Sequence, residues 1–153
     1  MPIHHTSKKT SSRHRRGSCI VELQNPHGEE CILLAEQFGG VFLLPGGRAK
    51  HNESRMIASI RELYEETTLR PKATIFIGEC TSKYNHHKVF YHYVDQEASP
   101  VAQDDVKALH FYNPQNPDPF LWERCSLSTQ KMIENFIVWK DQHQNLLNTL
   151  KTL

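Results

Sequence analysis

Residues 47–69 read GRAKHNESRMIASIRELYEETTL, and this stretch decides the fold. A short apolar segment, residues 41–44, precedes it and is predicted to form a strand that stops at a glycine-rich loop. Apolar residues then recur at helical spacing and Asn52 is a suitable N-cap, so we expect a helix over about residues 53–67. A strand, a glycine-rich loop and a helix in succession favour a mixed α/β architecture.

The predicted helix carries three carboxylates on one face. At about 100° per residue, Glu62 and Glu66 point the same way and Glu65 lies about 60° to one side. The apolar residues expected to be buried lie on the opposite side: Met56, Ile60, Leu63 and Tyr64. Like charges at this spacing repel, and a divalent cation such as Mg²⁺ reverses the sign of that interaction. The pattern favours a magnesium site with room for phosphate; the alternative is a glutamate-rich face that is only solvated.

The residues around the acidic face add features of a phosphate site. Gly46 and Gly47 allow close approach of the backbone, and a carbonyl there can reach a metal ion. Arg48 places a positive charge beside this loop, where it is a candidate substrate-binding residue. Arg61 is spaced for an ion pair with the glutamate four residues later, which would orient that carboxylate. Glu53, at the helix start, is favourably placed relative to the helix dipole.

The full spacing over residues 47–69, Gly-x5-Glu-x7-Arg-Glu-Leu-x-Glu-Glu-x-Thr-Leu, resembles the Nudix box. Every charged position of that motif is kept, and Thr68 stands where the family usually has glycine. The resemblance implies an α/β fold, a Nudix-type α/β/α sandwich around a mixed β-sheet. It also implies hydrolysis of the diphosphate linkage in a nucleoside diphosphate derivative.

The resemblance also implies roles for single residues. Glu62, Glu65 and Glu66 match the metal ligands of the family, and the Gly46 carbonyl is a further ligand. Glu53 supports this acidic cluster and, with Glu62 and the arginine that precedes it, completes the set of candidate catalytic residues. The expected cofactor is Mg²⁺, for which Mn²⁺ can substitute. The implied reaction is attack of water on a phosphorus atom of the diphosphate.

The identity of the general base is left open. Some members of the family use a box glutamate, which corresponds to Glu62, and we favour that residue. Others use an acid from a later loop, for which Glu97, Asp104 and Asp105 are the candidates. Each of these loop acids has the alternative interpretation of a solvated surface residue.

Three substrate hypotheses remain. We favour a MutT-like pyrophosphohydrolase of nucleoside triphosphates. The second is a dinucleoside polyphosphate or diphosphoinositol-type hydrolase, because Tyr84 lies fifteen residues after Leu69, near where dinucleoside polyphosphate hydrolases carry a tyrosine. Phe90, Tyr91 and His92 would line a base-stacking pocket beside it, or belong to the core. The third is a nucleotide-sensing or RNA-binding module without turnover, against which the intact acids argue.

Composition favours one domain preceded by a basic segment. The 153 residues, 38% of them hydrophobic, are enough for one sizeable core. Residues 18–153 are expected to form the Nudix domain. Residues 1–17 are Ser/Thr-rich and basic, which is typical of a flexible arm that is solvated or attracts polyphosphate or RNA. The four widely spaced cysteines have no metal or redox spacing and are expected to be reduced.

Charge and hydropathy limit the partners. A net charge of +1 argues against a dedicated nucleic-acid binder, so no specific nucleic acid is expected. No apolar run is long enough for a membrane span or signal peptide, so we expect a cytoplasmic protein that acts on a nucleotide-like small molecule. A homodimer is left open.

The remaining elements follow from local patterns. Strands are predicted at residues 18–23, 31–35, 73–79, 89–94 and 106–112. A segment with prolines at 114, 117 and 119 is not expected to be regular helix. Ser128 is expected to cap a C-terminal helix that continues towards Leu150.

Overall fold

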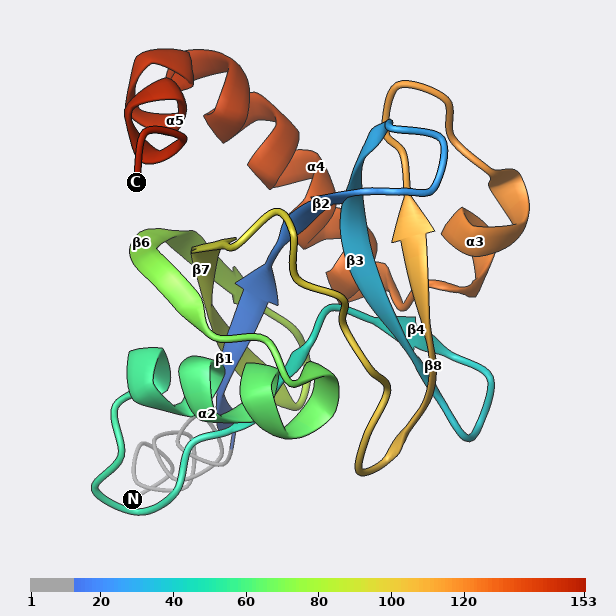
Figure 1. The fold of residues 1–153 in the computed structure, drawn as a ribbon. Helices are drawn as coiled ribbons and strands as arrows, with labels where there is room; N and C mark the ends of the chain where they lie inside the picture. The colour runs from blue at the N-terminus through green and yellow to red at the C-terminus, as the bar shows by residue number, and fades with distance from the viewer. Residues whose placement is uncertain (1–12) are drawn as a thin grey trace, which may run out of the picture.

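The computed structural model describes residues 13–153, and within them the chain forms two four-stranded sheets and four helices (Figure 1). The first sheet has the strand order β5 (Gly46–Arg48), β1 (His14–Ile20), β7 (Asn85–Val94) and β6 (Pro71–Thr81). The second contains β2 (Glu22–Gln24), β3 (Glu30–Gln37), β4 (Phe42–Leu43) and β8 (Val106–Tyr112). The helices are α2 (Arg55–Thr67), α3 (Pro119–Arg124), α4 (Leu127–Gln142) and α5 (Gln144–Leu150).

The first sheet is mixed, as expected. Strands β1 and β7 run parallel, whereas β1 with β5 and β6 with β7 are antiparallel pairs. Alternate residues of β1 belong to different cores. Cys19 packs in the cluster that contains Leu63 of α2, and Ile20 packs in the cluster that contains Phe136 of α4. Since side chains alternate across a strand, α2 and α4 lie on opposite faces of this sheet, and the expected α/β layering is confirmed.

Strand β1 begins earlier than the sequence indicated. The strand expected from Ser18 starts at His14, so residues 14–17 belong to the sheet rather than to an arm. Residues 1–12 of the expected arm lie outside the described residues. Gly17 lets α2 pack against this part of the strand, because a Cβ there would lie 2.2 Å from the Arg55 carbonyl oxygen of α2. The helix therefore rests directly on the β1 backbone.

This close contact changes which face of α2 is buried. Of the apolar residues expected inside, Leu63 is buried, but Met56 and Tyr64 are 43% and 42% exposed. The buried residues are Ala58, Ser59, Leu63 and Thr67. Small side chains pack here because the helix approaches the sheet at a glycine, and larger ones would not fit.

Several element boundaries also differ from the sequence predictions. The cap of α2 is Ser54, whose hydroxyl accepts from the Ile57 amide, and not Asn52, which has a φ of 65° in the preceding turn. Helix α3 forms in the proline-rich segment because Pro119 occupies its first turn, where no amide donor is needed. Ser126, rather than Ser128, caps α4.

All four cysteines are free thiols, in line with the sequence. Of the helices between residues 13 and 153, none is long and apolar enough to cross a membrane.

Candidate active site

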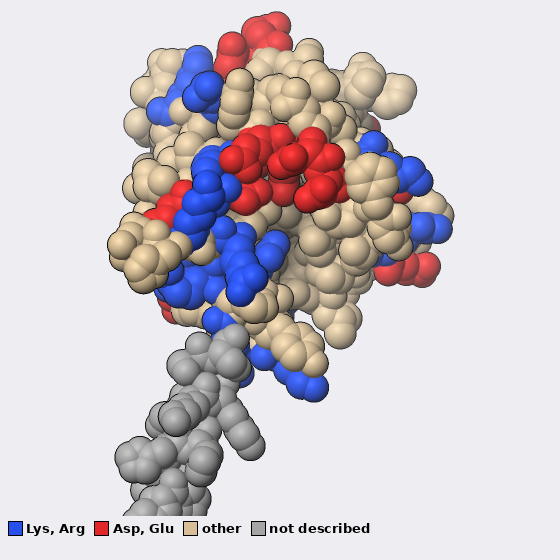
Figure 2. Space-filling model, turned by 90° about the horizontal axis from the view of Figure 1, so that it is seen from below, with Lys and Arg blue, Asp and Glu red and all other residues tan. Residues whose placement is uncertain are grey.

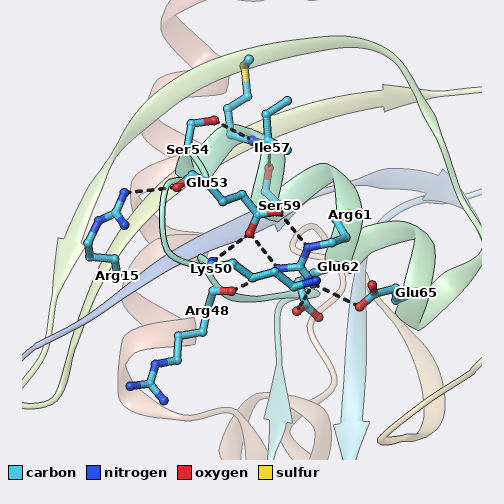
Figure 3. A network of polar contacts seen from close by, with 11 residues as sticks. Arg15, Arg48, Lys50, Glu53, Ser54, Ile57, Ser59, Arg61, Glu62 and Glu65 are labelled. Atoms are coloured by element: carbon cyan, nitrogen blue, oxygen red, sulfur yellow. Dashed lines mark hydrogen bonds and ion pairs between the residues drawn. The ribbon is translucent and has the colours of Figure 1, made fainter.

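Arg61, in the middle of α2, is the centre of an ion-pair network (Figure 3). Its Nε and Nη2 atoms each donate to one oxygen of Glu53, both at 2.9 Å. Its Nη1 atom donates to Glu62 at 2.9 Å and to Glu65 at 3.2 Å. The expected pairing with Glu65 is therefore present, but the bidentate partner is Glu53, eight residues earlier. This pairing, with the Lys50 amide, lowers the pKa of Glu53 to about 2.

Glu62 lies against the glycine loop. A Cβ on Gly47 would be 2.5 Å from the Glu62 carboxyl carbon, so the absence of a side chain at residue 47 makes room for this carboxylate. Burial raises the pKa of Glu62, although the Arg61 bond opposes that effect. The glycine that the sequence marked as a loop residue thus forms one wall of the acidic site.

Glu66 is the most deeply placed of the three glutamates. Its Oε1 accepts a hydrogen bond from the Gly46 amide at 3.1 Å, which joins α2 to the edge strand β5. Burial, together with the charges of Glu62 and Asp104, raises the pKa of Glu66 to about 8, although the Gly46 hydrogen bond and the Arg16 charge oppose this shift. A partly buried carboxylate without a full countercharge is electrostatically unfavourable unless a cation joins it.

One of the three loop acids lies near this cluster. The Gln103 amide donates to the Glu66 carbonyl at 3.0 Å, so the loop before β8 docks on the end of α2. Asp104 follows with a φ of 58° and is close enough for its charge to act on Glu66. Within residues 13–153, no hydrogen bond or ion pair links Glu97 or Asp105 to the glutamates, and both are exposed.

Thr68 occupies the turn that the family usually gives to glycine. It caps the C-terminal end of α2 with a φ of 67°, and its amide donates to the Tyr64 carbonyl at 2.8 Å. This is the left-handed region, which β-branched residues rarely adopt. The turn geometry is therefore retained although the residue is not glycine.

Arg16 is a site residue that the sequence analysis missed. It lies on β1 opposite Arg48 of β5, and the charges of Glu66 and Glu62 act on its guanidinium. Burial lowers the pKa of Arg16, which still remains a cation at neutral pH. The sequence placed it in a basic arm, and its only local signal was its position two residues before an apolar strand.

The predicted substrate residues have different positions. Arg48 is exposed beside the acidic cluster, and its carbonyl accepts from Arg61. Tyr84 is 63% exposed at the β6–β7 turn, and no contact among the described residues joins it to the glutamates. Phe90, Tyr91 and His92 are buried core residues, as the alternative interpretation held.

The surface around the site carries an acidic region and a basic region side by side. Figure 2 shows acidic side chains as a red band with Lys and Arg side chains directly beside and below it. A basic cavity of about 310 Å³ adjoins the start of β1 and the end of β5; its lining is Arg13, His14, Arg15, Arg48, Ala49, Lys50 and His51. The arrangement suits a ligand that combines phosphate groups with a bound cation.

Among the described residues, no three His, Cys, Asp or Glu side chains already form a closed metal cage. The Nη1 atom of Arg61 pairs with Glu62 and Glu65. It would have to release both carboxylates for them to bind a metal ion, while Nε and Nη2 stay on Glu53. The donors nevertheless suit a hard divalent ion: they are carboxylate oxygens, one of them poorly compensated, next to a cradle that a Cβ on Gly47 would fill.

Comparison with known proteins identifies the family. A family model described as the NUDIX domain matches residues 13–126, which includes the whole site. The chain belongs to the Nudix hydrolases. This family acts on pyrophosphate bonds and uses divalent metal ions. A search among curated proteins gave no match.

Solved Nudix structures share the fold. A putative Nudix hydrolase family member from Chromobacterium violaceum is 21% identical, with a TM-score of 0.72 and 93% of each chain covered. An Ap4A hydrolase from C. elegans is 12% identical, with a TM-score of 0.63, covering 84% of this chain and 98% of that one. A bifunctional NMN adenylyltransferase/ADP ribose pyrophosphatase from Francisella tularensis, complexed with AMP and Mn, is 16% identical, with a TM-score of 0.62, covering 88% of this chain and 45% of that one.

Proposed function

We propose that this Nudix hydrolase is a metal-dependent pyrophosphohydrolase of nucleoside triphosphates, of MutT-like type. The observation that carries the proposal is the arrangement at the β5 edge, where Glu62 and Glu66 meet Gly46 and Gly47 beside Arg16. Acids that bind a cation and an arginine that binds phosphate are both needed to hold a triphosphate chain. These groups lie within one patch of the surface.

The proposed metal ligands are Glu62, Glu65, Glu66 and the carbonyl of Gly46, with Mg²⁺ as the cofactor and Mn²⁺ as a substitute. When bound, the ion offsets phosphate charge and lowers the pKa of a bound water. The manganese in the Francisella tularensis relative supports a divalent ion of this class.

The chain's own residues supply orientation and proton transfer. Glu53 fixes Arg61 through two hydrogen bonds, so that the guanidinium keeps its place beside the glycine loop when Nη1 releases the carboxylate of Glu62. Glu62 is the proposed general base, because burial favours its protonated form more than in a free carboxylate. Asp104 is the alternative base, since its loop docks on the end of α2.

A second candidate is a more anionic substrate, namely a dinucleoside polyphosphate or a diphosphoinositol phosphate. The basic cavity that includes Arg13, Arg15 and Arg48 favours it, because additional phosphate groups would lie there within reach of positive charge. The Ap4A hydrolase among the similar structures shares the fold, but at 12% identity the similarity supports the fold alone and not the substrate.

The test is release of phosphate or diphosphate with Mg²⁺ or Mn²⁺ from a substrate panel. The panel contains canonical and oxidised nucleoside triphosphates, dinucleoside polyphosphates, ADP-ribose, nucleotide sugars and diphosphoinositol phosphates. We expect nucleoside triphosphates to have the highest kcat/KM. Glu66→Gln should reduce turnover by at least about a hundredfold and still unfold cooperatively, whereas Glu134→Gln, on the exposed side of α4, should not affect it.

Each other result has a definite meaning. Preference for a more anionic substrate would replace the triphosphate proposal by the second candidate. A folded protein without turnover of any substrate with either metal would contradict both and leave a binding module. Loss of cooperative unfolding in Glu66→Gln would make that glutamate a structural residue.

A further inference from the structure

His87 carries a buried nitrogen that the fold does not satisfy. The residue is 7% exposed, and its Nδ1 lies 2.8 Å from the Ser18 hydroxyl oxygen. In the part of the chain that the structure describes, its Nε2 has no hydrogen-bond partner. Buried polar atoms are nearly always bonded, so an unpaired one marks Nε2 as a candidate group for binding a further molecule.

The position of His87 relates it to the acidic site. Residues paired in adjacent strands point to the same face, and His87 of β7 pairs with Arg16 of β1. Gly17, between Arg16 and Ser18, faces α2, so these three side chains lie on the other face of the sheet. Two strand spacings, roughly 10 Å, separate the β7 backbone from that of β5. Arg16 lies between them.

The charges around His87 indicate what kind of ligand it can bind. Burial, together with the Arg16 charge, lowers the pKa of His87 to about 4, so the ring is neutral at neutral pH. When the Ser18 hydroxyl donates to Nδ1, the ring proton is on Nε2, which becomes a donor. Arg16 offers donors only. A ligand shared by these two groups must therefore be an acceptor, and an anionic one suits the cation.

We propose that Arg16 and His87, with Ser18 as the positioning residue, form a subsite in which the guanidinium and the Nε2–H group donate to phosphate oxygens of the substrate. This inference rests on the proposed function and deepens it. It places the phosphate groups of the substrate on the β1–β7 side of the glutamates, so that they extend from the β5 edge across the sheet. Arg16 is shared between the acids on one side and His87 on the other.

Two replacements of His87 distinguish the roles of its two ring nitrogens. The amide of asparagine reaches the position of Nδ1, so His87→Asn keeps the Ser18 contact and removes the Nε2 donor. The longer glutamine places an amide donor near the position of Nε2. His86→Asn is the matched control, because the neighbouring histidine contacts Arg55 and Glu79 instead.

Affinities are measured by calorimetry with Mg²⁺ for two compounds that resist hydrolysis, methylenediphosphonate and an α,β-methylene nucleoside triphosphate. We expect His87→Asn to bind both about tenfold more weakly, the factor that corresponds to one hydrogen bond to a charged group. His87→Gln should stay within about threefold of the wild type, and His86→Asn should equal it.

A second measurement does not depend on the folding of a variant. In the wild type labelled with ¹⁵N-histidine, addition of methylenediphosphonate should shift the His87 Nε2 resonance and leave that of His86 in place. Absence of this shift overturns the proposal. Unchanged affinity of His87→Asn for both compounds also overturns it. So does a His87→Asn variant that binds only the nucleoside triphosphate analogue more weakly and methylenediphosphonate normally, because Nε2 would then contact the nucleoside.

These readouts are independent of turnover. A wild type that binds both compounds and shows the Nε2 shift, but hydrolyses nothing, would contradict the proposed function and support the subsite. A wild type that hydrolyses nucleoside triphosphates with unchanged kinetics in His87→Asn would support the function and overturn the subsite.

Discussion

At residue 47 the presence or absence of one methyl group determines where the Glu62 carboxylate lies. A Cβ there would come within 2.5 Å of the Glu62 carboxyl carbon, closer than nonbonded carbons approach. We expect Gly47→Ala to displace this carboxylate and to lower kcat by about a hundredfold, because small misplacements of catalytic groups have effects of that size. Thermal unfolding should change by only a few degrees.

The control for this substitution is Gly39→Ala, whose Cβ would have no neighbour within 4 Å and whose φ is not positive. It should leave kcat unchanged. If Gly47→Ala retained wild-type kcat, the glutamate would not need its present position for the reaction.

His92 gives the fold a dependence on pH. It is fully buried, with one ring nitrogen 2.9 Å from the Ser59 hydroxyl and the other 2.8 Å from that of Thr74. Burial lowers its pKa to about 4 from the ordinary 6.5. The unfolded chain therefore binds more protons between these values, so the free energy of unfolding should fall as pH decreases from 6.5 to 4, by roughly 3 kcal/mol for this residue.

Urea unfolding at pH 7.0, 5.5 and 4.5 measures this effect. His92→Gln should be less stable at pH 7 and should lose less stability on acidification than the wild type. His27→Gln, in an exposed turn, is the control and should keep the wild-type slope. Equal slopes in the His92 variant and the wild type would refute the assignment.

Among the elements, α2 and β1 are in close contact through Gly17. A Cβ on Gly17 would lie 2.2 Å from the Arg55 carbonyl oxygen and 2.9 Å from the Ser59 amide nitrogen, so alanine forces the helix away from the strand. We expect Gly17→Ala to reduce the free energy of unfolding by about 2 kcal/mol, in the range of overpacked cores. Denaturant titration measures this, and a loss below about 0.5 kcal/mol would show that α2 moves aside freely.

The sequence predicted the grouping of the α2 glutamates better than the packing of the helix. Glu62, Glu65 and Glu66 lie in one cluster around Arg61 and the glycine loop, and their role as metal ligands stays a prediction. The prediction of which face of α2 is buried was wrong, because the apolar pattern contains no information on the close contact between the helix and the Gly17 backbone. Met56 is exposed and Ser59 is fully buried for this reason.

Two other sequence predictions were wrong because a residue was interpreted by its usual structural preference. Arg16 is charged and lies in a basic segment, which indicated an arm, but the acids of α2 compensate it within the sheet. Pro119 indicated an irregular segment, but it begins α3, where its missing amide costs nothing. In both cases the deciding partner was a tertiary contact or a position within the turn, which local composition does not contain.

On the scale of the whole molecule, Lys140 ties α4 to the second sheet. Its ammonium group lies 2.5 Å from Glu22 and 2.6 Å from Glu30. Glu22 is 7% exposed, and burial raises its pKa although Lys140 and Tyr91 bond to it. Lys140→Met should leave this carboxylate without its countercharge and reduce the free energy of unfolding by about 3 kcal/mol.

The double variant with Glu22→Gln should recover part of that loss, because the neutral amide carries no uncompensated charge. Lys131→Met, an exposed lysine on the same helix, is the control and should change stability little. No recovery in the double variant, measured by denaturant titration, would show that Lys140 acts through packing rather than charge.

The parallel pairing of β1 with β7 has a consequence for the order of events during synthesis. Ser18 and His87, which it brings into contact, are 69 residues apart, whereas β6 and β7 are joined by a short turn and can pair locally. A nascent chain that has emerged only as far as α2 carries the whole Nudix box but has no partner for the inner edge of β1. The β5 edge that receives Glu66 is itself paired only with β1 in this sheet. The contacts that hold Glu62 and Glu66 against β5 involve only residues up to α2, whereas the Ser18–His87 contact forms only after β7 has left the ribosome.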